Sequence, residues 1–128
     1  MREIVREWIK KGESDFVAAK TLSLQKGLEN QTGFHCQQAI EKWLKAFLIE
    51  KGEEIRKIHD LMALVIDCEK YDPDFHEIEP LVDGISDFAV EFRYPGENAT
   101  PEEAKDALNK TIKIRDFLLK KIEYEEKS

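Results

Sequence analysis

The stretch from residue 34 to residue 48 constrains the fold of this chain more than any other part. Its apolar residues recur three and four positions apart, which is the spacing of one face of an α-helix. They are Cys36, Ala39, Ile40, Trp43, Leu44, Phe47 and Leu48, and the polar residues on the opposite face are Gln38, Glu41, Lys42 and Lys45. The sequence therefore predicts a helix with one buried face and one polar stripe, and periodicity alone favours a solvent-exposed stripe.

The rest of the chain shows the same helical spacing in segments near residues 2–26, 59–70, 78–92 and 101–124. Gly27 and Gly52 supply stops, and Thr100 followed by Pro101 and two glutamates is the best defined helix start. Residues 28–33 are predicted to connect two long antiparallel helices, with Thr32 as the cap of the second. The prediction is an all-α, antiparallel up-and-down bundle of four main helices plus a short extra helix, in one domain over residues 1–128.

Composition limits the kinds of protein this chain can be. The sequence is 41% hydrophobic and 37% charged, with no apolar run near the roughly 20 residues that cross a bilayer and no signal-peptide core. We therefore expect a cytoplasmic protein with no membrane partner. The net charge of −7 argues against sequence-blind adhesion to nucleic acid. The abundant lysine and glutamate are typical of a thermophilic source.

Motifs for metals and cofactors are missing from the sequence. Cys36 and Cys68 have no CxxC spacing and are predicted to be free thiols. The histidines form no Glu-x-x-His or His-x-x-x-His pair, and neither glycine-rich phosphate-binding motif occurs. We expect no metal and no cofactor, so a ligand would have to be bound by side chains and helix ends.

Basic and aromatic side chains around the polar stripe are the candidates for binding a ligand. Ammonium, guanidinium and imidazole groups suit phosphate, and a tyrosine ring can stack on a base. The candidates are Lys42, Lys45, Arg56, His59, Asp60, Arg93 and Tyr94. The alternative interpretation is structural: Glu41 and Lys45 form an exposed ion pair, Asp60 caps a helix, and Tyr94 packs in a loop.

Four pieces of the sequence together resemble the HEPN domain family of bacteria and archaea. They are DFVAA at residues 15–19, QQAIEKWLKA at 37–46, HDL at 59–61 and RYP at 93–95. The resemblance implies a helical up-and-down bundle that commonly forms homodimers. It also implies a gene neighbour encoding a minimal nucleotidyltransferase, as in toxin–antitoxin modules.

The resemblance further implies that active family members are metal-independent ribonucleases, whose motif is an arginine separated from a histidine by four to six residues. This chain has no histidine after His76, and Arg56 and His59 are too close together to fit the motif. Without that imidazole the mechanism lacks its proton-transfer group, so we expect no ribonuclease activity.

The predicted function is that of an accessory protein that binds a nucleotide or RNA, a partner nucleotidyltransferase, or both. In that hypothesis Lys42, Lys45 and Arg93 contact phosphate, His59 and Asp60 orient the site, and Tyr94 stacks. One alternative is a structural dimer subunit with no ligand. A further alternative is a divergent ribonuclease that uses His59 with Arg93.

Overall fold

The structure is a computed structural model that describes residues 2–54, 57–91 and 95–127, with backbone alone for 87–91 and 123–127. Its α-helices are α1 (Glu3–Leu22), α2 (Glu29–Glu50), α3 (Leu61–Glu69), α4 (Glu79–Glu91) and α5 (Pro101–Lys127), and η1 (Pro73–Ile78) is a 3-10 helix. None of the residues in these ranges belongs to a strand. The all-α prediction is therefore confirmed.

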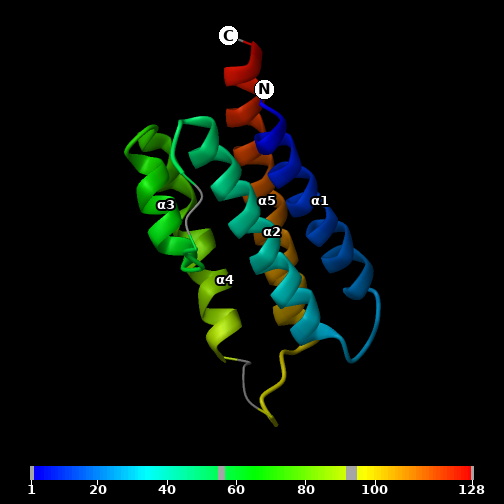
Figure 1. Cartoon of the computed structure of the whole chain (residues 1–128). Coiled ribbons are helices and arrows are strands. Elements are labelled where there is room, and N and C mark those ends of the chain that lie inside the picture. The colour runs from blue at the N-terminus through cyan, green and yellow to red at the C-terminus, as the bar shows by residue number, and fades with distance from the viewer. Residues whose placement is uncertain (1, 55–56, 92–94, 128) are drawn as a thin grey trace.

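Helix α2 is the centre of the arrangement, because it contacts each of the other four α-helices. Figure 1 shows α1 running antiparallel beside it, with α5 packed along the same side of the bundle. The shorter elements α3 and α4 cover the other side of α2 (Figure 1). The result is the up-and-down bundle that the helical periodicity predicted. Within the described part of the chain, no helix is long and apolar enough to cross a bilayer.

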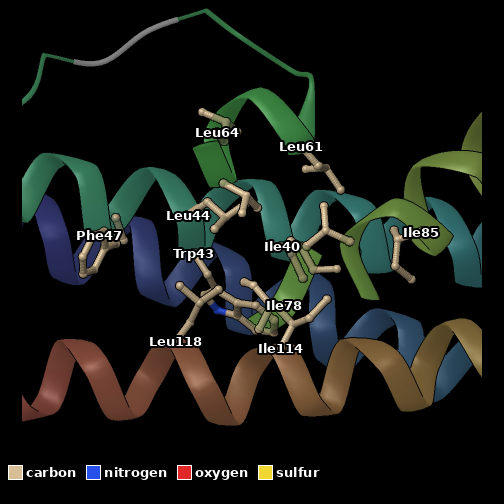
Figure 2. Packing of buried hydrophobic residues seen from close by; sticks show 14 of the residues in the cluster. Ile40, Trp43, Leu44, Phe47, Leu61, Leu64, Ile78, Ile85, Ile114 and Leu118 are labelled. Carbon is tan, nitrogen blue, oxygen red and sulfur yellow. The ribbon is translucent and has the colours of Figure 1, made fainter. Parts of the chain in front are cut away.

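The predicted apolar face of α2 is buried along its whole length. Figure 2 shows Trp43 pointing from α2 toward Ile114 and Leu118 of α5, while Leu61 and Leu64 of α3 lie on the opposite side of α2. All five side chains are at most 1% exposed. Burying both flanks of one helix explains why this stretch of sequence determines so much of the fold.

Gly12 allows α1 and α2 to approach closely. A Cβ atom added at this position would lie 2.5 Å from Cδ1 and Nε1 of Trp43, and 3.2 Å from the carbonyl oxygen of Ala39. One turn along α1, the ring of Phe16 meets the Trp43 ring edge-on, with centroids 5.7 Å apart. The glycine weakens the helix locally, and the tryptophan occupies the space that it leaves.

Several predicted helix ends are confirmed, and two are wrong. Gly52 follows the end of α2 with φ of 97°, and Thr100 and Glu103 exchange the two hydrogen bonds of a capping box. Gly27 does not end the first helix, because α1 already ends at Leu22. Thr32, however, lies inside α2 and its hydroxyl donates to the Leu28 carbonyl. Because α1 ends at Leu22 and α2 begins at Glu29, the connection covers residues 23–28 and not the predicted residues 28–33.

The two cysteines lie in different parts of the core, and both are buried free thiols as predicted. Burial raises the pKa of the Cys36 thiol to about 11, against the opposing effect of a hydrogen bond with Thr111. Burial, followed by the charges of nearby carboxylates, also raises the pKa of the Cys68 thiol. Neither group is a nucleophile at neutral pH.

Candidate functional site

Asp15 of α1 contacts the polar stripe of α2 through its carboxylate. Asp15 Oδ1 lies 2.9 Å from Nδ1 of His35, and Asp15 Oδ2 accepts a hydrogen bond from the Lys42 ammonium. The Asp15 side chain is only 15% exposed, and a carboxylate at such a position requires partners. Because the two helices are antiparallel, one α1 residue can join two α2 residues that are two turns apart. We refer to Asp15, His35 and Lys42 as the Asp15 cluster.

A second group, the Glu41 cluster, lies further along α2 and consists of Glu41, Lys45, His59 and Trp8. Glu41 Oε2 lies 3.2 Å from Lys45 Nζ and 3.1 Å from His59 Nδ1. The Lys45 ammonium also lies 5.7 Å from the centre of the Trp8 ring. Glu41 and Lys45 are thus held between α1 and the segment that precedes α3.

Burial of the Glu41 cluster corrects one expectation from the sequence. The predicted ion pair between Glu41 and Lys45 exists, but these side chains are 6% and 7% exposed, so this half of the stripe is not a solvated face. Helical periodicity placed both residues opposite the apolar face of α2 and could not show that Trp8 of α1 covers them. The Oε1 atom of Glu41 is buried and has no hydrogen-bond partner among the described residues.

Of the other candidate residues, His59 and Asp60 are described by the structure and three are not. The His59 side chain is 76% exposed, with only its Nδ1 side turned to Glu41. Asp60 caps α3, because its carboxylate accepts hydrogen bonds from the backbone N–H groups of Met62 and Ala63. The predicted site residues Arg56, Arg93 and Tyr94 lie outside the described residues. The structure therefore joins Lys45 and His59 through Glu41, and it pairs Lys42 with Asp15.

Both lysines of the stripe are neutralised by carboxylates. Lys42 is paired with Asp15 and Lys45 with Glu41, so a phosphate group would have to displace a carboxylate to reach either ammonium group. The Glu41–His59 contact has the form in which a carboxylate orients an imidazole for proton transfer. These contacts fit recognition of neutral or mixed-charge groups better than recognition of phosphate alone.

Phe34 also belongs to the polar stripe, but it was not among the candidates, most of which are charged residues. It precedes Gln38 by four positions and Lys42 by eight, which places it on the same face of α2. Its side chain is 54% exposed, and its described ring contact is an edge-on approach to His35, with centroids 5.2 Å apart. Extending the stripe one turn toward the start of α2 would have found it from the sequence.

A separate groove lies at the other end of α1. It has a volume of about 550 Å³ and lies between the α1–α2 loop and the start of α5, where Leu22, Leu24, Pro101 and Leu108 are among the lining residues. None of the candidate residues lines it. The polar stripe and this groove are therefore different surfaces.

The fold and the stripe together define the class of protein: an all-α up-and-down bundle with an ion-paired polar face on its central helix. The HEPN domain model matches residues 5–122, so the chain belongs to the HEPN domain family. This confirms the resemblance seen in the sequence.

Two solved structures agree with this assignment. The crystal structure of TT1696 from Thermus thermophilus is similar in fold, with a TM-score of 0.79, 24% identity, and coverage of 94% of this chain and 99% of that one. The crystal structure of ST0689, an archaeal HEPN homologue, gives a TM-score of 0.75 and 25% identity over 95% of this chain and 99% of that one. No curated protein sequence matches the chain at a significant level.

Proposed function

We propose that this protein is a HEPN subunit that docks a protein partner through the exposed end of the α2 stripe, and that the first such partner is a second copy of the chain. We define this surface, the α2 face, as Gln31, Phe34, Gln38 and Lys42. The observation that carries the proposal is the half-exposed aromatic ring of Phe34 beside part-buried polar groups. Aromatic side chains bordered by polar groups are enriched at protein–protein interfaces.

Two further considerations support a protein partner. HEPN domains often dimerise. In addition, the pairing of Lys42 with Asp15 removes the free positive charge that a phosphate ligand would need, while it leaves hydrogen-bonding groups suited to a protein surface. The dimer would then serve as the unit that accompanies a minimal nucleotidyltransferase, as in a toxin–antitoxin module. A nucleotidyltransferase in the neighbouring reading frame, and its copurification with this protein, would support that extension.

Light scattering on the purified protein tests the α2 face directly. We expect a dimeric mass at micromolar concentration for the wild type and a monomeric mass for Phe34→Glu, with an unchanged far-UV circular dichroism spectrum. The matched control is Leu24→Glu, because Leu24 is 84% exposed but lies in the α1–α2 loop, away from this face. A monomeric wild type, or a Phe34→Glu variant that is still dimeric, contradicts the proposal.

Nucleotide or RNA binding at the Glu41 cluster is a second candidate function, and one observation favours it. The buried Oε1 atom of Glu41 has no described donor, and an amino group on a nucleobase would supply one. The exposed ring of His59 lies beside it, where it can contact the sugar or the phosphate of the same ligand. In this arrangement the base, and not the phosphate, makes the buried contact.

A thermal-shift series with nucleotides and short RNA tests this second function. We expect an increase in Tm with at least one ligand, lost in His59→Ala and kept in Lys113→Ala, an exposed position on α5. No shift with any nucleotide or RNA would reject binding at this cluster. If the wild type cleaves a mixed RNA substrate and His59→Ala does not, the divergent ribonuclease is the correct alternative.

A further inference from the structure

Three metal-ligating side chains converge on the side of the bundle opposite α1. They come from three different elements: Glu69 ends α3, His76 lies in η1, and Glu79 begins α4. One donor atom from each of these residues lies within 4.8 Å of the others. None of them belongs to the Asp15 or Glu41 cluster.

The packing of η1 explains why these groups meet. Asp72 caps η1 by accepting a hydrogen bond from the Asp74 N–H, and Phe75 and Ile78 bury the inner side of this short helix. The Phe75 ring lies with its centroid 4.5 Å from that of Phe47 on α2, which fixes η1 against the core. His76 is thereby left on the outer side, at the junction of α3 and α4.

The charges at this junction are not balanced by the protein. A carboxylate oxygen of Glu69 and one of Glu79 lie within 4.8 Å of each other. Two carboxyls in such contact need a proton or a cation between them. Among the described residues, His76 is the only basic side chain paired with either of them, at 2.9 Å from Glu79. Glu69 Oε2 is buried and accepts no hydrogen bond from a described donor.

We propose that Glu69, His76 and Glu79 bind a divalent transition-metal ion, for which zinc is the best match. Two carboxylate oxygens and one imidazole nitrogen form the mixed donor set that zinc accepts, with a fourth position left for water. Ligands about 2.1 Å from a tetrahedral ion lie about 3.4 Å apart. The donor atoms lie within 4.8 Å of one another, so the widest pair needs to close by at most about 1.4 Å. The exposed His76 ring can make this movement once its hydrogen bond to Glu79 opens.

The sequence contains a signal for this site that the metal motifs considered above do not cover. His76 and Glu79 form a His-x-x-Glu pair, the reverse of the Glu-x-x-His order that the sequence lacks. Residues spaced by three positions lie on the same side of a helical turn, so both can face one ion. A bound ion would join α3, η1 and α4, which are otherwise held together by apolar packing and helix caps.

Titration of the EDTA-stripped protein with zinc chloride, by calorimetry and by thermal melting, tests the site. We expect one equivalent to bind, with Tm rising by about 10 °C at zinc concentrations about a hundredfold above Kd. Glu69→Gln and His76→Ala should each weaken binding at least about tenfold. The matched controls Glu77→Gln, an exposed neighbour, and His59→Ala, a histidine outside the cluster, should bind zinc as the wild type does.

The same melts check that the variants are folded. In EDTA, Glu69→Gln should melt no lower than the wild type, because the substitution removes one of two opposed carboxylates. A wild type that shows neither saturable heat nor a Tm increase overturns the proposal. It is equally overturned if Glu69→Gln and His76→Ala bind zinc like the wild type, or if His59→Ala abolishes binding, because the ion then lies elsewhere.

Discussion

The polar stripe of α2 and the junction of α3, η1 and α4 each combine glutamate with histidine in a part-buried setting. They differ in whether a basic side chain neutralises the carboxylates. In the stripe, Glu41 is paired with Lys45, and Asp15 with Lys42. At the junction, Glu69 faces Glu79 with no described lysine or arginine beside them. A buried carboxylate with a cationic partner is already neutralised by the protein. Two adjacent carboxylates without such a partner can instead bind a cation.

The difference follows from the lengths of the elements. Helices α1 and α2 have 20 and 22 residues, so side chains on one can be matched with side chains on the other over several turns. Helix α3 has nine residues and η1 has six. With so few turns, the junction is formed by residues at helix ends, and Lys70, which follows Glu69, is paired with Asp67 instead.

The largest expected effect comes from making the same substitution in both regions. Glu41→Gln leaves the Lys45 ammonium buried without a carboxylate, so we expect the free energy of unfolding to fall by about 3 kcal/mol. Glu69→Gln should leave it unchanged or slightly higher, because one of two opposed carboxylates is removed. Urea denaturation of both variants without metal provides the measurement. Equal losses would show that the two regions do not differ in charge balance.

A smaller effect on stability is expected from adding a methyl group at two helical glycines, Gly12 on α1 and Gly84 on α4. In Gly12→Ala the new methyl group would overlap Trp43, so we expect a loss of about 2 kcal/mol, even though alanine favours helix by about 1 kcal/mol. Gly84→Ala on α4 is the control, because its methyl would meet the flexible end of Lys110, 2.7 Å from Nζ. We expect this variant to be as stable as the wild type or more so, by chemical denaturation. A stabilised Gly12→Ala variant would mean that α1 can move away from α2.

The smallest effect concerns Asp72, a carboxylate near the junction that does have a cationic partner. Burial raises its pKa, but hydrogen bonds from Lys121 and from the Asp74 N–H outweigh burial and hold the pKa below the usual 3.8. The lowered pKa contributes stability that is present above pH 3.8 and is lost as the pH falls through the folded-state value.

We therefore expect Lys121→Gln to reduce stability at pH 6 by about 1 kcal/mol and to flatten the acid-induced decrease. Urea midpoints measured from pH 6 down to pH 2.5 would show this, with Lys120→Gln, an exposed neighbour on α5, as the control. An identical pH dependence in Lys121→Gln and the wild type would mean that the pair does not act on stability.

Local sequence patterns predicted the helices well, because they depend on neighbouring residues. The glycine after α2 and the Thr100–Glu103 box lie where expected, whereas α1 ends five residues before Gly27. The 3-10 helix η1 lies between two segments with helical spacing and was not predicted as a helix, since six residues are too few for a periodic signal. Thr32 was misplaced as a cap, because its side chain can donate to a carbonyl within a helix as readily as it can cap one.

The sequence by itself determined the class of this protein: a helical bundle around α2, with the four motifs of a HEPN domain in order. Only the tertiary structure decided that Lys45 and Glu41 are buried, that Asp15 joins two turns of α2, and that Glu69 meets Glu79. Helix formation and helix ends depend on residues a few positions apart, so they can be read along the chain. Charge pairing depends on which side chains the packed helices bring together, and those partners can be far apart in the sequence, 27 residues for Asp15 and Lys42 and 47 for Asp74 and Lys121.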